Sequence, residues 1–72
     1  MTIFEHVLVI INGEPQRLTD GVTLTELINQ LGLNQRRIAV ELNRAIIARE
    51  HYGAQVLNDG DEVEIVHFVG GG

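Results

Sequence analysis

The segment between Thr23 and Gly32 limits the possible folds, because it specifies one amphipathic helix. Thr23 and Glu26 have the spacing of a capping box, in which a hydroxyl and a carboxylate three residues later satisfy backbone N–H groups. Apolar residues then recur with the period of a single helical face, at Leu24, Leu27, Ile28 and Leu31. Gly32 stands where a left-handed C-cap residue is expected. We therefore predict a helix of about ten residues, close to the average length, with one apolar face to bury.

Strand patterns flank this helix on both sides. Before it, residues 7–11 form a β-branched apolar run, Asn12-Gly13 is a strong hairpin signal, and residues 14–19 return as an edge strand that tolerates Pro15. After the helix we expect, in order, strand 38–42, turn 43–44, short strand 45–48, an irregular stretch or single helical turn at 51–55, turn 58–61 and strand 62–69.

This order of elements predicts an α+β fold. A helix that is joined to a hairpin and followed by further strands buries its apolar face across one side of a mixed sheet, here of four to five strands. Residues 7–11 and 62–69 are the most apolar, so they should be the central strands. The connection corresponds to a β-grasp arrangement. We expect one domain over residues 1–69 and a flexible glycine tail over residues 70–72.

Composition and charge exclude several classes of function. The 72 residues carry a net charge of −5, which argues against nucleic-acid binding and favours a basic protein partner. Cysteine is absent, so the sequence holds no disulfide, thiolate metal site or cysteine nucleophile. It shows neither a leader pattern nor a run approaching the about 20 apolar residues of a membrane span. We expect a soluble, cytoplasmic protein without a membrane partner.

The sequence shows no catalytic or metal-binding pattern. His6, His51 and His67 are scattered without the spacing of metal ligands, although neighbouring strands could bring His6 and His67 together. The acidic residues within 59–64 suit a solvated turn and strand better than a calcium loop. No phosphate-binding loop, dinucleotide fingerprint or Ser/His/Asp pattern is present. We therefore expect no bound metal and no enzymatic activity of the chain's own.

The glycines at the end of the sequence are the main candidate site. Gly70, Gly71 and Gly72 lack side chains, so they can enter a narrow channel and present an ionised carboxylate to a partner that holds ATP. Many such tails simply fray, but this one directly follows a predicted core strand. All five basic residues are arginine, which reflects either compositional drift or the exclusion of side-chain amines from the vicinity of an activated terminus.

Alternation along the last strand predicts a docking surface beside this tail. If Val63 and Ile65 face the helix, the alternate residues emerge on the open face of the sheet. There we expect an apolar patch bordered by acids, comprising Val66, Phe68, Leu8, Ile10, Glu62 and Glu64. Contiguous exposed patches usually mark interaction sites. The alternative is that residues 2–5 or a second subunit cover the patch.

Four stretches give the chain a family resemblance: "INGEP" at 11–15, "TLTELINQLGL" at 23–33, "IAVELNRAIIARE" at 38–50 and "LNDGDEVEIVHFVGGG" at 57–72. With these the chain resembles the ThiS family, the sulfur carrier proteins of thiamine biosynthesis. The resemblance covers all but about the first six residues. It implies a β-grasp, ubiquitin-like fold.

The resemblance also implies a reaction at the C-terminus. A ThiF-like enzyme would use ATP to adenylate the carboxylate of the Gly71-Gly72 pair. Sulfur would convert Gly72 to a thiocarboxylate, a terminal 1-thioglycine, and a ThiG-like thiazole synthase would accept that sulfur. Gly70 lies outside the pair. The chain would bind no cofactor itself and would be a monomer when free.

Other classes of protein share an activated terminus or this fold. The small subunit of molybdopterin synthase has the same fold and Gly-Gly end, although its chains are usually somewhat longer. A ubiquitin-like modifier would instead be joined to lysines of target proteins, and a plain binding module would not be activated. A free thiocarboxylate would favour a carrier, whereas conjugates in cells would favour a modifier.

Overall fold

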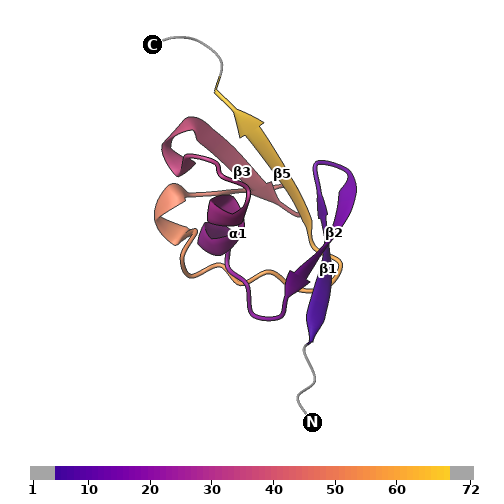
Figure 1. Cartoon of the computed structure of the whole chain (residues 1–72). Coiled ribbons are helices and arrows are strands. Elements are labelled where there is room, and N and C mark those ends of the chain that lie inside the picture. The colour runs from indigo at the N-terminus through magenta and orange to yellow at the C-terminus, as the bar shows by residue number, and fades with distance from the viewer. Residues whose placement is uncertain (1–4, 69–72) are drawn as a thin grey trace.

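The computed structural model describes residues 5–68, which form a five-stranded mixed sheet and one α-helix (Figure 1). β1 and β5 are parallel, and every other neighbouring pair of strands is antiparallel. The predicted β-grasp arrangement is confirmed, with β1 and β5 as interior strands. In spatial order the strands are β2 (Glu14–Thr19), β1 (His6–Ile11), β5 (Glu62–His67), β3 (Ile38–Leu42) and β4 (Ala45–Ile47).

Helix α1 (Leu24–Gln30) begins as the capping box predicts. The Thr23 hydroxyl accepts a hydrogen bond from the Glu26 N–H at 3.2 Å, and the Glu26 carboxylate accepts one from the Thr23 N–H at 3.1 Å. The helix has seven residues, fewer than the about ten expected, because it ends at Gln30 with Leu31 as its C-cap. Gly32 follows with the predicted left-handed conformation, at a φ of 71°. The Leu33 N–H then donates to the Ile28 carbonyl at 3.1 Å and closes the helix end.

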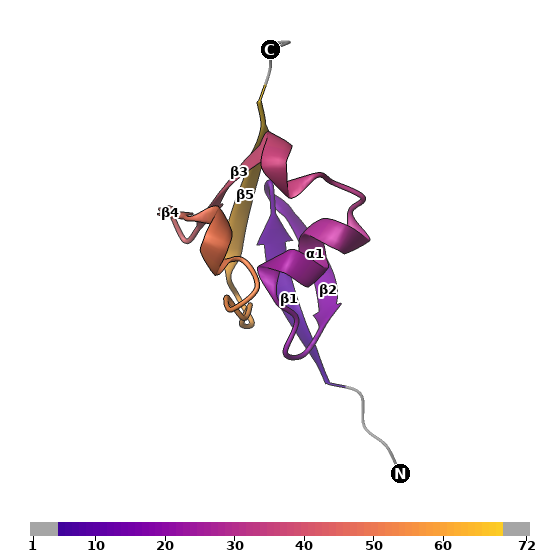
Figure 2. The ribbon, with the colours of Figure 1, turned by 90° about the vertical axis from the view of Figure 1, so that its left-hand side faces the viewer.

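The core lies between α1 and one face of the sheet, with α1 in front of the strands in Figure 2. Leu24, Leu27 and Ile28 project from the helix and are almost fully buried. Tyr52 and Leu57, from the connection between β4 and β5, are buried beside them. Within residues 5–68 no polar or charged residue is buried, so apolar burial dominates the stability of this core. Alternate strand residues complete it, among them Val7, Val9, Ile11, Ile38, Val40, Leu42, Val63 and Ile65.

Two asparagines join the hairpin turns to β5. Asn12 and Asn43 each begin a tight turn, with φ of 49° and 51°. The Asn43 N–H donates to the Glu62 carbonyl at 2.8 Å, and the Asn43 side-chain oxygen accepts from the Glu62 N–H at 2.9 Å. The Asn12 carboxamide likewise bonds the backbone of Ile65. Both turns therefore help to position the central strand.

Two short 3-10 turns complete the described fold, and a few element ends differ slightly from the prediction. One turn (η1, Gln35–Arg37) precedes β3, and another (η2, Arg49–His51) falls slightly before the single helical turn expected at 51–55. β4 ends at Ile47, one residue earlier than predicted. Val69, the predicted end of the last strand, and the boundary between domain and tail lie outside the described residues. No helix among residues 5–68 has the length and apolarity to cross a bilayer.

Candidate functional site

The last strand leads towards the glycine tail, and its end is hydrogen-bonded to the start of β3 and to the residue before it. His67 pairs with Ile38 at the last position of the β5–β3 ladder. Beyond the ladder, the Phe68 N–H donates to the Arg37 carbonyl at 2.9 Å. We call Phe68 and Arg37 the tail root. Gly70–Gly72 lie outside the described residues, so their predicted role at the C-terminus stays a prediction.

β5 presents two different faces, as its alternation predicts. Val63 and Ile65 are buried on the side of α1, whereas Val66 and Phe68 are 57% and 60% exposed. Because the helix covers one side of the sheet, the outward residues of a pleated strand emerge on the other, which we call the open face. Glu62 and Glu64 are also exposed. The predicted exposure of these four residues is confirmed, and their docking role stays a prediction.

Leu8 and Ile10 share the open face but lie at its far end. Because β1 and β5 are parallel, Ile10 pairs with Glu62 at the start of β5, whereas Val66 pairs with Ala39 near the end of β5. Four strand residues separate these two levels, roughly 13 Å. The expected proximity of Leu8 and Ile10 to Val66 is therefore wrong. Local alternation predicts the face of a residue, but it does not predict the level at which parallel strands pair.

Ile46, expected only within a short strand at 45–48, lies on the open face in the structure. Its side chain is 80% exposed. Ile46 pairs with Glu41 of β3, and Glu41 pairs with Glu64 of β5. The alternation of this short edge strand could have indicated its exposure. We define the tail-side patch as the open-face residues near the end of β5, namely Val66, Phe68, Ile46, Glu41 and Glu64.

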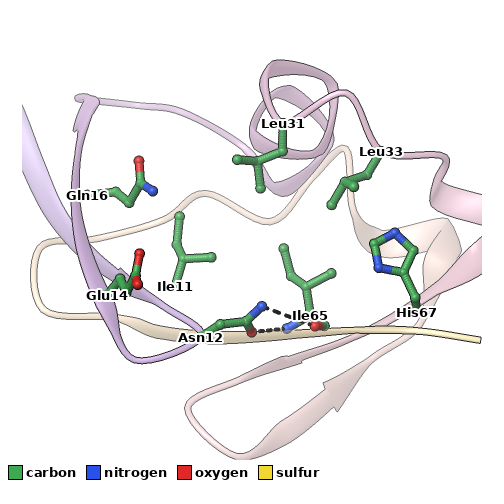
Figure 3. A pocket seen from close by; sticks show the side chains of 8 residues that line it. All are labelled: Ile11, Asn12, Glu14, Gln16, Leu31, Leu33, Ile65 and His67. Atoms are coloured by element: carbon green, nitrogen blue, oxygen red, sulfur yellow. Dashed lines mark hydrogen bonds between the residues drawn. The ribbon is translucent and has the colours of Figure 1, made fainter.

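A pocket of about 420 Å³ lies on the opposite face, beside the end of β5 (Figure 3). Leu31 and Leu33 point from the helix end towards Ile65, and Glu14 stands across from them on β2. The lining holds one carboxylate and one imidazole, His67, but no paired nucleophile and base. Its remaining residues are Ile11, Asn12 and Gln16.

The histidines and the acidic turn have separate places in the fold. His6 begins β1 and His67 ends β5, so the parallel pairing puts them at opposite ends of the sheet instead of side by side. No group of three or more potential metal-ligating side chains occurs within residues 5–68. Asp59 accepts from the Leu8 N–H at 2.7 Å, and Asp61 accepts from the Asn58 N–H at 2.7 Å. The acidic cluster thus helps to shape the turn before β5.

The chain matches a known protein family over most of its length. The ThiS family model matches residues 9–72, from within β1 to the last glycine. The chain belongs to the ThiS family. The crystal structure of the thiamine biosynthesis protein ThiS from Geobacter metallireducens is similar with a TM-score of 0.79 and 35% identity, covering 92% of this chain and 100% of that one.

Two further relatives are a sulfur carrier protein and a thiazole synthase. The sulfur carrier protein ThiS of Bacillus subtilis is 43% identical over 53 residues, which are 74% of this chain and 80% of that protein. A thiazole synthase of Magnetococcus marinus is 47% identical over 62 residues, which are 86% of this chain and 19% of that protein. This ThiS-family chain thus matches a sulfur carrier over most of its length and a thiazole synthase over a small part.

Proposed function

We propose that this ThiS-family chain carries the sulfur for the thiazole ring of thiamine. Its similarity to a sulfur carrier protein and to part of a thiazole synthase supports this role and favours it over a molybdopterin pathway. The tail root is the structural observation that carries the proposal. An interior strand, hydrogen-bonded up to Phe68, precedes Val69 and three glycines. A strand end that is hydrogen-bonded up to Phe68, followed by a short segment that ends in three glycines, suits delivery of a carboxylate into a partner's active site.

The reacting group in this proposal is the Gly72 carboxylate. Its oxygen attacks the α-phosphorus of ATP bound to a ThiF-like adenylating enzyme, pyrophosphate leaves, and an acyl adenylate forms. A hydrosulfide equivalent then attacks the acyl carbon, and AMP departs with the bonding electrons. The product is a thiocarboxylate, 1-thioglycine at position 72, which a ThiG-like thiazole synthase accepts as sulfur donor. The chain is therefore a co-substrate, and its partners supply the catalytic groups.

The tail-side patch is the proposed docking surface for these partners. Val66, Phe68 and Ile46 are each more than half exposed, and the exposed Glu41 and Glu64 lie in one row across the sheet with Ile46. An apolar patch with acids suits a partner surface that combines apolar side chains with basic ones. Docking next to the tail root would aim the tail, because four residues beyond Phe68 span at most about 14 Å.

The decisive experiment measures the intact mass of the protein after incubation with an adenylating enzyme, ATP and a sulfur donor. We expect a mass increase equal to the replacement of one oxygen by sulfur, located by fragmentation at Gly72. A known sulfur carrier treated in parallel shows that the assay works. An unmodified terminus beside a reacting control would reject the proposal. Amide conjugates to other proteins, without a thiocarboxylate, would identify a modifier instead.

The pathway is tested separately from the activation. The thiocarboxylate form should support thiazole formation by a thiazole synthase in a purified system, and the carboxylate form should not. Support for molybdopterin formation alone would reassign the chain to that pathway. Gel filtration of the free chain tests the proposed monomer, and limited proteolysis tests the proposed boundary between residues 1–69 and the tail.

A further inference from the structure

The positively charged residues of the chain include no lysine, and they are unevenly distributed over the fold. All five are arginine, although lysine is among the commonest residues of soluble proteins. Arg36 and Arg37 lie in η1, directly at the tail root. Arg49 joins them, because its guanidinium donates to the Gln35 carbonyl at 3.1 Å and to the Arg36 carbonyl at 3.5 Å. Three of the five positive charges therefore gather where the tail begins.

Position 37 lies within reach of the C-terminal acyl group. The Arg37 carbonyl accepts the Phe68 N–H at 2.9 Å, continuing the antiparallel pairing of Ile38 with His67. Residues opposite each other in such a pair have Cα atoms about 5 Å apart. Four residues follow Phe68, and they span at most about 14 Å. A chain of this length, rich in glycine, can fold back to meet a long side chain at position 37.

An amine in that place would be chemically harmful to an activated terminus. Its nitrogen would attack the acyl carbon, the leaving group would depart with the bonding electrons, the nitrogen would lose a proton to solvent, and an amide would form. A lysine with the ordinary pKa of about 10.4 is unprotonated to only roughly 0.04% at pH 7. Because the fold would hold the lysine amine beside the tail, its effective concentration near the acyl group would be high, which offsets the low unprotonated fraction. A guanidinium stays protonated, so arginine supplies the same charge without a nucleophile.

We infer that the exclusion of lysine, above all at position 37, protects an activated C-terminus from acylating the protein's own side chains. The inference rests on the proposed activation of Gly72. It explains why positive charge at the tail root is carried by arginine alone. It also assigns Arg37 a role in chemical selectivity, because the acyl group remains free for a sulfur nucleophile.

The test needs no activating enzyme. The wild-type chain, Arg37→Lys and Arg17→Lys are each prepared with a C-terminal thioester by intein cleavage, and their masses are followed at mildly alkaline pH. Arg17 is the matched control, since it lies opposite Leu8 at the far end of the sheet. In Arg37→Lys we expect loss of the thiol as an internal amide forms, at least about tenfold faster than in Arg17→Lys. The rate should not depend on protein concentration.

Further controls separate the role of the fold from the presence of an amine. In concentrated guanidinium chloride, where the sheet no longer holds residue 37 beside residue 68, the difference between the two variants should disappear. The wild-type chain reports hydrolysis and any reaction of the N-terminal amine, and circular dichroism checks that the variants fold. Equal rates in folded Arg37→Lys and Arg17→Lys, or hydrolysis alone in both, would overturn the inference. Because the thioester is installed chemically, neither result depends on whether an enzyme adenylates Gly72.

Discussion

The Asn12 side chain makes two hydrogen bonds with the backbone of Ile65, 53 residues further along the chain. Its nitrogen donates to the Ile65 carbonyl at 3.2 Å, and its oxygen accepts from the Ile65 N–H at 2.7 Å. The regular pairing of β1 with β5 ends before this point, at Ile11 and Val63. The Asn12 carboxamide therefore takes the place of a peptide group and extends the contact between two interior strands. This contact positions β5 shortly before the tail root.

Replacing Asn12 by glycine should lower the free energy of unfolding by about 2 kcal/mol. Glycine accepts the positive φ of the turn, so the main loss is the pair of hydrogen bonds, which leaves part-buried groups of Ile65 without partners. Asn43→Gly is the matched control, because the Asn43 side chain makes similar bonds at an exposed position where water can replace them. Urea denaturation should show the larger loss for Asn12→Gly, and equal losses would contradict this account.

Leu27→Ala should cost about 3 kcal/mol, a large part of the stability of so small a domain. Leu27 is 1% exposed, and its removal leaves a cavity between α1 and the sheet. Leu31→Ala is the matched control, since Leu31 caps the same helix but is 38% exposed and has less apolar area to lose. Thermal unfolding followed by circular dichroism should rank the two in this order; a reversed ranking would contradict the burial of Leu27 at the centre of this core.

Arg44→Gly should raise the free energy of unfolding by about 0.5 kcal/mol. Arg44 has a φ of 73°, and a left-handed conformation costs a residue with a side chain about 1–2 kcal/mol. The greater entropy of glycine in the unfolded chain cancels part of that gain. Arg44→Ala removes the same charge but keeps the strain, so it separates the two effects. If urea denaturation finds glycine no more stable than alanine at this position, backbone strain is not the cause.

Val66→Ser and Phe68→Ser should weaken activation of the tail while leaving the fold intact. Both side chains are exposed in the tail-side patch, so we expect a decrease of about tenfold or more in kcat/KM for adenylation, with unfolding free energies within about 0.5 kcal/mol of the original. Leu8→Ser serves as control, because Leu8 is exposed on the same face at its far end. An equal decrease in Leu8→Ser would show that docking extends across the whole open face.

Deletion of Gly72 should stop all sulfur transfer and preserve the fold. The shortened tail ends about 3.5 Å too early for its carboxylate to meet ATP in the partner's site. A matched pair of substitutions refines the prediction: Gly70→Ala, outside the terminal pair, should retain activity, and Gly71→Ala should lose most of it through a clash in the narrow channel. Intact mass reports the thiocarboxylate in each variant. A truncated chain that still supplies sulfur would place the chemistry elsewhere.

The helix and the faces of the strands could be predicted because local interactions specify them. Thr23 and Glu26 bond to each other's backbone N–H groups, and Gly32 turns the chain a few residues later, so the signals lie within one short segment. The pleat alternates with every residue, so Val63 and Val66 emerge on opposite faces wherever the strand is placed. The exposure of Val66 followed from that alternation once the helix was assigned to the other face.

The main helix, the five strands and their buried faces follow from the order of residues along the chain, which also carries the resemblance to the ThiS family. The folded sheet is needed to show that Ile10 pairs with Glu62, that Leu8 lies far from Val66, and that Arg37 meets Phe68 at the tail root. Strand pairing joins residues that are distant in the chain, and the same alternating pattern is compatible with several registers. The packing of α1 across one face, together with side-chain contacts such as that of Asn12 with Ile65, selects one of them.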